Sequence, residues 1–413
     1  MSPSDSVSPH APAPPDRIDL GPLALRLKGA GLGVGVVCLA LAVIWGAVLG
    51  DDMRRFFHSY LFAFAYFLSI ALGALFFVVL HHLVGATWSV VVRRLAEIVT
   101  GAFPVLFVLM LGIAIPLLAG NKSLYLWMDA DVVQHDPILS GKAAYLNGPF
   151  FIARLFIYFA VWMAISRYYM KRSVEQDESG DPAVSARLRK VAAPAMIAFA
   201  LTTAWAAFDL LMSLTPHWFS TIYGVYYFAG CAISIYCLLA VLSYALQRSG
   251  RMVRSIKLDH YHDMGKMANG FTLFWAYIAF SQFMLIWAAN LPEESEFFRP
   301  RMFADWKWVS LGLILFHFGI PFVGMMARHV KRTPELLAGW ALYMLAMHAV
   351  DVFWLVMPAY SPDAVVVSPI DFLCLAGMGG LFLYGALSVA GGVRLLPLGD
   401  PRLKASVHFV GYP

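Results

Sequence analysis

The chain has 413 residues, of which 60% are hydrophobic and 13% are charged, and its mean hydropathy is +0.70. This composition excludes an ordinary soluble domain of that length and is typical of an integral membrane protein. The formal net charge of +5 lies mostly in the loops between apolar runs, which indicates contact with anionic lipid and not with nucleic acid.

The chain begins with a polar segment, residues 1–29, whose first 20 residues are rich in Pro and Ser and are predicted to be disordered. Ten apolar runs follow, and each is long enough to cross a bilayer core of about 30 Å, which needs roughly 20 helical residues. The runs lie at 30–50, 57–83, 94–118, 148–170, 190–214, 218–247, 267–290, 305–329, 335–358 and 369–390. We therefore predict an all-α membrane domain over residues 30–390, followed by a tail at 391–413.

The basic residues predict the orientation of these ten spans. Segments on the N-terminal side, here called side A, hold 22 of the 30 Lys and Arg residues, and the opposite side, side B, holds seven. Because short cytoplasmic loops carry the excess of basic residues, side A is predicted to be cytoplasmic, and with it both termini. The localisation predicted for a bacterial protein of this kind is the inner membrane, as a multi-pass protein.

Similar segments in spans 2 and 6 suggest an internal repeat. YFLSIA at 66–71 resembles YFAGCA at 227–232, and the two spans run in the same direction. This pattern predicts a parallel repeat of two four-helix bundles, residues 57–214 and 218–358, flanked by spans 1 and 10. Shared membrane composition is the alternative explanation of the similarity.

The sequence gives no support for a metal or a covalently bound cofactor in this chain. All four cysteines, Cys38, Cys231, Cys237 and Cys374, lie inside spans, and none forms a C-x-x-C or C-x-x-C-H motif. The side-B loop 119–147 carries Asp129, Asp131, His135 and Asp136, but their spacing is irregular for a metal site. We interpret this loop and the loop 291–307 as docking surfaces for other subunits.

One group of polar residues lies near side B and could contact a quinone. Asp209 in span 5 is followed across the turn by His217 and Tyr223, and Arg154 enters span 4 from the same side. A carboxylate, a histidine and a tyrosine near one bilayer surface could bind a quinol head group and accept its proton. The alternative is that Asp209 pairs with Arg154 for structural reasons. With His58 near the start of span 2, these five residues form the predicted quinone site.

A second group could carry protons, because a charge at membrane depth costs about 3 kcal/mol or more and usually marks function or a satisfied pair. His348 and Asp351 are three residues apart on one face of span 9, His317 lies in span 8, and Asp371 begins span 10. Glu97 in span 3, near side A, is the fifth residue predicted for this proton path. Ordinary hydrogen bonds between helices are the alternative for the first four, and ion pairs of Glu97 with Arg93 and Arg94 are the alternative for Glu97.

Three stretches carry a resemblance to a known family. They are GKAAYLN at 141–147 leading into Pro149, FDLLMSLTPHWFSTIYG at 208–224, and FWAYIAFSQ at 274–282 leading to WAANLPEE at 287–294. Together they resemble the second large membrane subunit of bacterial alternative complex III, a quinol:cytochrome c oxidoreductase. That subunit belongs to the NrfD-like, polysulfide-reductase membrane-subunit superfamily, and the resemblance covers roughly residues 30–395.

The resemblance implies an integral subunit of a respiratory electron-transport complex that supports quinol oxidation and has no redox centre of its own. It implies as partners multihaem and monohaem cytochrome c subunits, an iron–sulfur protein and a paralogous NrfD-like subunit. Haem and iron–sulfur clusters would then belong to those partners. If this subunit binds a quinone, the resemblance implies menaquinone or ubiquinone. The resemblance leaves both answers open on whether the subunit translocates protons.

A secondary transporter built from a parallel repeat is the alternative function. Such a protein should have helices broken by Gly or Pro near the membrane midplane in equivalent spans. The main interior prolines, Pro104 in span 3 and Pro321 in span 8, fall in spans that do not correspond in the repeat. This difference argues against transport.

Overall fold

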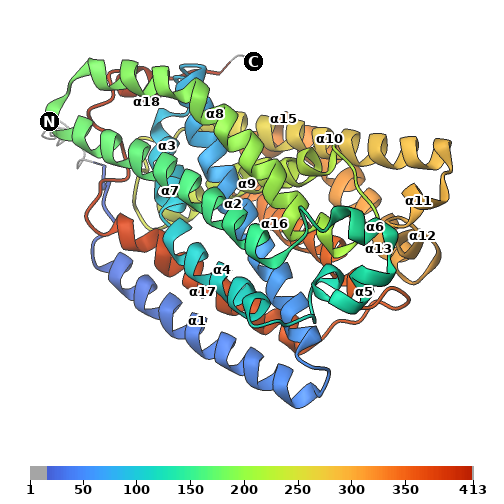
Figure 1. Cartoon of the computed structure of the whole chain (residues 1–413). Coiled ribbons are helices and arrows are strands. Elements are labelled where there is room, and N and C mark those ends of the chain that lie inside the picture. The colour runs from blue at the N-terminus through green and yellow to red at the C-terminus, as the bar shows by residue number, and fades with distance from the viewer. Residues whose placement is uncertain (1–15, 412–413) are drawn as a thin grey trace, which may run out of the picture.

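The computed structural model describes residues 16–411 and contains ten helices that are long and apolar enough to cross a membrane. This confirms the predicted all-α fold with ten spans (Figure 1). The spans are α1 (Pro22–Leu49), α2 (Arg54–Leu83), α3 (Val90–Thr100) with α4 (Phe103–Leu118), α7 (Gly148–Ser179), α8 (Pro182–Leu210), α9 (Tyr223–Arg248), α10 (Leu258–Ala289), α13 (Trp306–Gly312) with α14 (Ile320–Met326), α16 (Pro334–Val356) and α17 (Pro369–Ala390). Short helices lie between them: α5 (Ala130–His135), α6 (Pro137–Lys142), α11 (Pro292–Ser295), α12 (Arg299–Phe303) and α15 (Arg328–Arg332). A further short helix, α18 (Leu403–Val407), follows the last span.

Several helices begin earlier or end later than the apolar runs. Helix α1 starts at Pro22, so residues 22–29 belong to the first span and not to the polar N-terminal segment. Helix α7 continues to Ser179, and Asp181 then caps α8 by accepting a hydrogen bond from the backbone N–H of Ala183. Disorder was predicted for residues 1–20, of which residues 1–15 lie outside the described part of the chain. Residues 16–20 are ordered, because the carbonyls of Arg17 and Ile18 accept hydrogen bonds from Met252 and Leu395.

The third span is interrupted at residues 101–102, between α3 and α4. Pro104 has no backbone N–H, so the carbonyl of Thr100 loses its usual partner four residues ahead. The hydroxyl of Ser166 in α7 lies 3.3 Å from that carbonyl oxygen and 2.8 Å from the Thr100 hydroxyl, so its single hydrogen can be shared between these two acceptors. A neighbouring helix thereby supplies a donor for the carbonyl exposed by the break, as membrane helices require.

Helices α2 and α9 are the most buried spans and pack against each other at the centre of the molecule. A Cβ atom on Gly73 would lie 2.0 Å from the carbonyl oxygen of Cys231, so only glycine permits this close approach. The hydroxyl of Tyr227 donates to the carbonyl of Ala65 at 2.6 Å. The two similar segments of spans 2 and 6 are thus direct neighbours.

The other spans group around these two helices. Helices α3, α4, α7 and α8 contact one another and α2, whereas α10, α14 and α16 contact one another or α9. Helix α1 packs along α17 on the outside of the first group (Figure 1). This arrangement matches the predicted pattern of two four-helix groups with spans 1 and 10 beside them.

The loops alternate between two faces, as ten spans require. On side B, hydrogen bonds and an ion pair link all five loops to one another. They are Ser123 Oγ to the Asp52 carbonyl (3.0 Å), Lys142 Nζ to the Pro216 carbonyl (2.6 Å), His217 to Glu296 (3.4 Å), the Asp305 N–H to the Asp363 carbonyl (3.3 Å) and Tyr360 Oη to Asp51 (3.2 Å). Figure 1 shows α5, α6, α11 and α12 at this end of the bundle.

On side A, the N-terminal end of the described chain contacts both the loop after α9 and the segment after α17. The N–H of Met252 donates to the carbonyl of Arg17 at 3.0 Å, and the N–H of Leu395 donates to the carbonyl of Ile18 at 2.7 Å. The C-terminal residues 391–411 therefore pack on the bundle and include α18.

Cysteine labelling tests the predicted orientation. In a Cys38→Ala background, Ser179→Cys at the exposed side-A end of α7 and Glu293→Cys in the exposed side-B loop place thiols on opposite faces. We expect a membrane-impermeant maleimide added from the periplasm to label position 293 and to leave position 179 unlabelled, because side A carries most basic residues. The reverse pattern would contradict the orientation.

Candidate functional site

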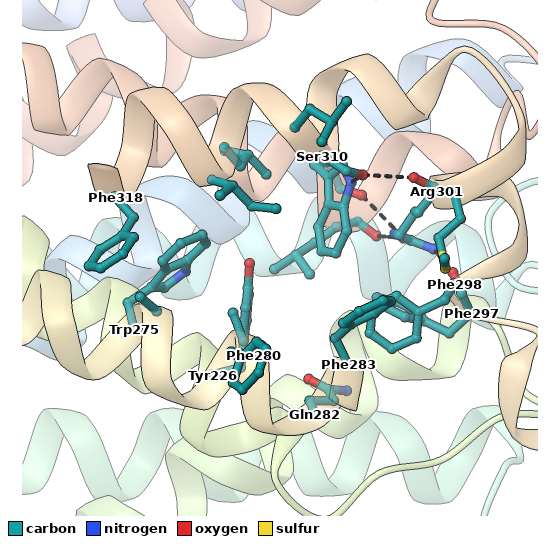
Figure 2. A pocket seen from close by; sticks show the side chains of 18 of the residues that line it. Tyr226, Trp275, Phe280, Gln282, Phe283, Phe297, Phe298, Arg301, Ser310 and Phe318 are labelled. Carbon is teal, nitrogen blue, oxygen red and sulfur yellow. Dashed lines mark hydrogen bonds between the residues drawn. The ribbon is translucent and has the colours of Figure 1, made fainter. Parts of the chain in front are cut away.

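A cavity of about 560 Å³ lies in the second group of helices, between α9, α10, α12, α13 and α16 (Figure 2). Its outer rim includes apolar side chains that are more than half exposed, among them Phe280 of α10, Trp308 of α13 and Ile314 just after α13. Its inner wall is made of buried aromatic residues. Those are Tyr223, Tyr226, Trp275 and Phe297. Because the rim lies on lipid-facing spans near side B, the cavity opens toward the membrane and suits an apolar ligand.

Arg301 of α12 is a buried cation in the cavity wall. Its guanidinium donates to the carbonyls of Phe297 (2.7 Å), Trp354 (3.1 Å) and Leu355 (3.0 Å), and it has no acidic partner among the described residues. Trp354 and Leu355 belong to the C-terminal turn of α16, where the helix dipole favours a positive charge. Burial lowers the pKa of Arg301 to about 9, which still leaves it charged at neutral pH.

Three polar atoms of the cavity lining have no hydrogen-bond partner within residues 16–411. They are the hydroxyl of Tyr223, Nε2 of Gln282 and Nε of Arg301, and all three side chains are buried. Each is a donor, and a buried donor without an acceptor costs about 1–3 kcal/mol. A ligand with carbonyl oxygens would satisfy them.

A cluster of titratable residues lies behind the inner wall. His317, His348 and Asp351 are buried and offer ligand atoms that all lie within 4.8 Å of one another. The hydroxyl of Tyr226 and the indole N–H of Trp275 both donate to the Asp351 carboxylate, the latter at 3.2 Å. Since Tyr226 and Trp275 also line the cavity, one layer of side chains separates the cavity from the cluster.

Local backbone features position the two histidines. His317 lies in a π-helical segment, Leu313–Gly319, that joins α13 to α14. Pro321 follows and cannot donate to the carbonyl of His317, which favours such an irregular turn. Gly230 of α9 leaves room for His348, because a Cβ atom there would lie 2.4 Å from the imidazole Cε1.

The structure brings together three of the five residues predicted for the proton path. Asp371 lies instead at the side-B start of α17, where it pairs with Arg55 and accepts a hydrogen bond from Ser59 at 2.6 Å. Glu97 forms ion pairs with Arg93 (3.4 Å) and Arg94 (2.9 Å), which confirms the alternative of local i,i+3 and i,i+4 pairs. Both carboxylates are therefore held by arginines outside the cluster.

The five residues predicted for the quinone site do not converge on one cavity. Only Tyr223 lines the cavity described above. Asp209 accepts two hydrogen bonds from Arg154, at 2.8 and 2.9 Å, so the alternative of a structural pair is confirmed as a contact. His58 is buried at the side-B end of α2, where its Nδ1 lies 2.8 Å from the Arg54 carbonyl oxygen.

His217 lies outside the spans and joins two loops. It contacts Asp136 at 2.5 Å and Glu296 at 3.4 Å. The hydrogen bond from His217 and those from backbone N–H groups, including Leu139, hold the pKa of Asp136 below its usual value. Asp129 pairs with Lys122 at 2.8 Å, so these acids of the 119–147 loop have partners within the chain.

Trp275, Arg301 and Ser69 were not predicted as site residues. Arg301 was interpreted as part of a docking loop, but it is 3% exposed and faces the cavity. Trp275 lies within the FWAYIAFSQ motif, and Ser69 lies within the repeated segment of span 2, so both motifs offered a signal. A search of protein-family models and a search of curated proteins found no match to this chain.

Proposed function

We propose that this integral membrane protein is a subunit of a respiratory quinol:cytochrome c oxidoreductase, or of a complex with another periplasmic electron acceptor. The observation that carries the proposal is the lipid-facing cavity, two of whose wall residues, Tyr226 and Trp275, donate hydrogen bonds to Asp351 of the His317–His348–Asp351 cluster. The three sequence motifs that resemble alternative complex III support the same function. That the chain is a multi-pass membrane protein follows from the ten spans.

The cavity suits an isoprenoid quinone such as menaquinone or ubiquinone. Its aromatic wall matches the ring, and its opening between lipid-facing spans matches an apolar tail. The unpartnered donors of Tyr223, Gln282 and Arg301 can bind the oxygen atoms of the head group. The proposed quinone site therefore keeps Tyr223 and moves away from Asp209 and Arg154, which are paired with each other.

Quinol oxidation releases two protons and two electrons. Tyr226 can pass a proton to Asp351, with which it already shares a hydrogen bond, and His348 lies 3.9 Å beyond. The electrons must leave to redox metals, which the proposal assigns to partners: multihaem and monohaem cytochrome c subunits and an iron–sulfur protein. A paralogous NrfD-like subunit would lie beside this one in the bacterial inner membrane.

The helix interruptions do not follow the pattern expected of a repeat-built transporter. Span 3 is broken at residues 101–102 and span 8 contains the π-helical segment, whereas span 7, the equivalent of span 3, is the continuous helix α10. Inverted or parallel repeats in transporters usually break equivalent helices at the binding site. The asymmetry favours the oxidoreductase subunit.

Purification from native membranes in mild detergent tests complex membership. We expect stoichiometric haem and an iron–sulfur signal to co-purify with the assembled complex, because the partners would hold the redox metals. The chain expressed alone should show no haem absorption. A haem-free homo-oligomer from native membranes would support the transporter instead.

Filling the cavity tests the quinone site. Ala279→Trp places an indole among the lining residues, and we expect quinol oxidation to fall about a hundredfold while haem content stays constant, because displacing the head group misaligns it with Tyr226. Ala288→Trp adds the same bulk at an exposed position of α10 outside the cavity and serves as the matched control. Normal turnover of the assembled Ala279→Trp complex would place the quinone elsewhere.

A further inference from the structure

The His317–His348–Asp351 cluster has a feature that proton transfer does not require. The three side chains come from the π-helical segment and from α16 and are at most 2% exposed. Both nitrogens of His317 and Nδ1 of His348 have no hydrogen-bond partner in the part of the chain that the structure describes. A buried polar atom without a partner is costly. One nitrogen of each histidine and a carboxylate oxygen of Asp351 lie within 4.8 Å of one another, which suggests a missing ligand that accepts one lone pair from each side chain.

The hydrogen bonds of Ser69 determine which nitrogen of His348 carries the proton. The Ser69 hydroxyl lies 2.7 Å from the carbonyl oxygen of Tyr66 and 2.7 Å from His348 Nε2. When its single hydrogen is donated to Tyr66, its oxygen accepts from His348, and the imidazole carries its hydrogen on Nε2. In the neutral imidazole, Nδ1 then has a free lone pair, and it lies 3.9 Å from Asp351 Oδ2.

The Asp351 carboxylate is held in a similar way. Its oxygens accept hydrogen bonds from Tyr226 and Trp275, which fix its orientation and leave further lone pairs free. His317 is the third side chain with a free lone pair, and its ring packs edge to face on Trp275 at a centroid distance of 4.3 Å. The hydrogen bonds that His348 makes with Ser69, and those that Asp351 accepts from Tyr226 and Trp275, thus resemble the bonds that orient metal ligands in proteins.

We propose that His317, His348 and Asp351 form a binding site for one zinc ion. Two neutral imidazoles and one carboxylate are a common ligand set for Zn²⁺, which takes four ligands and would keep its fourth position for water. A proton shared between His348 and Asp351 would satisfy one nitrogen and leave His317 unpartnered, whereas a metal ion engages all three side chains. Ligand atoms spread over 4.8 Å need a small inward movement to reach the usual bond lengths of about 2.0–2.2 Å.

Zinc binding at this site can be tested separately from the proposed quinol oxidation. It needs no quinol, no partner subunit and no electron transfer, so it can be measured on the full chain alone. The lone pairs that bind zinc are the ones that would accept protons, so the two cations would compete for the cluster.

The test is the metal content of the full-length chain, purified in mild detergent without a polyhistidine tag, incubated with Zn²⁺ and dialysed. We expect about one zinc ion per chain for the wild type and less than about a tenth of that for His317→Gln combined with His348→Gln. His81→Gln is the matched control: this buried histidine of α2 lies outside the cluster, bound to the Phe77 carbonyl at 2.7 Å, and its loss should leave zinc in place. Zinc absent from the wild type, or retained by the double variant, would overturn the proposal.

A second measurement remains decisive if the double variant does not fold. X-ray absorption at the zinc edge of the wild-type chain should show nitrogen and oxygen ligands at about 2.0–2.1 Å with scattering from two imidazole rings. A spectrum without imidazole scattering would place the zinc outside the cluster and refute the assignment. Neither outcome depends on whether the protein oxidises quinol.

Discussion

Asp209→Asn is expected to lower the yield of folded, assembled protein more than it lowers turnover per assembled complex. Arg154 donates from Nε and from a terminal nitrogen to the two oxygens of Asp209, and Tyr158 donates to the same carboxylate at 2.8 Å. Asp209 is fully buried. The neutral amide removes the negative charge, and breaking a buried pair in this way costs about 3–5 kcal/mol because the arginine is left uncompensated.

The measurement is the fraction of monodisperse complex recovered, together with quinol oxidation normalised to haem. Asp131→Asn, which removes an exposed acid of the 119–147 loop, is the control and should assemble normally. Adding Arg154→Gln to Asp209→Asn should recover part of the yield, since no charge is then stranded. Full assembly with lost quinol oxidation would instead make Asp209 part of the reaction.

The second large effect is expected from His348→Phe combined with Asp351→Leu. This pair of changes removes two of the three titratable groups of the cluster and keeps apolar bulk suited to the helix interior. If Tyr226 passes a proton to Asp351, turnover and charge movement should both fall, by about 10²-fold or more, as is usual when a positioned proton acceptor is lost.

Quinol:cytochrome c turnover and membrane potential in reconstituted vesicles provide the two readouts. His262→Phe, a change at a buried histidine near the side-A end of α10, serves as the control. If both readouts of a fully assembled double variant match the wild type, the cluster carries no protons during turnover and its contacts are structural.

The number and alternation of the spans could be predicted because they depend on local composition. Each span is a continuous apolar run, and the excess of basic residues on alternate loops follows from the charge rule for membrane insertion. The helix ends were harder to predict, because α10 begins at Leu258, nine residues before its apolar run, and its polar first turn packs on α18, where His260 Nε2 lies 3.0 Å from the Ser406 carbonyl oxygen. Helical structure there follows from capping and packing, and not from hydropathy.

The candidate site could be predicted in part. The spacing of His348 and Asp351 places them on one helix face, so their proximity follows from the helical period. Their contacts with Tyr226 and Trp275 depend on how α9, α10 and α16 turn toward each other, and helices that are apolar all round carry little signal of that rotation. Asp371 was grouped with the wrong residues for the same reason: its partner, Arg55, is 316 positions away in sequence.

The π-helical segment, Leu313–Gly319, also affects how span 8 should be compared with other sequences. A π-turn accommodates one more residue than an α-turn, and one residue corresponds to a rotation of about 100° around a helix axis. Side chains of α14 therefore face a different direction from the one that a continuous helix starting at Trp306 would give them. A homologue without the π-turn should align with this chain only through a one-residue gap near His317, and positions on either side of that gap would keep their environments.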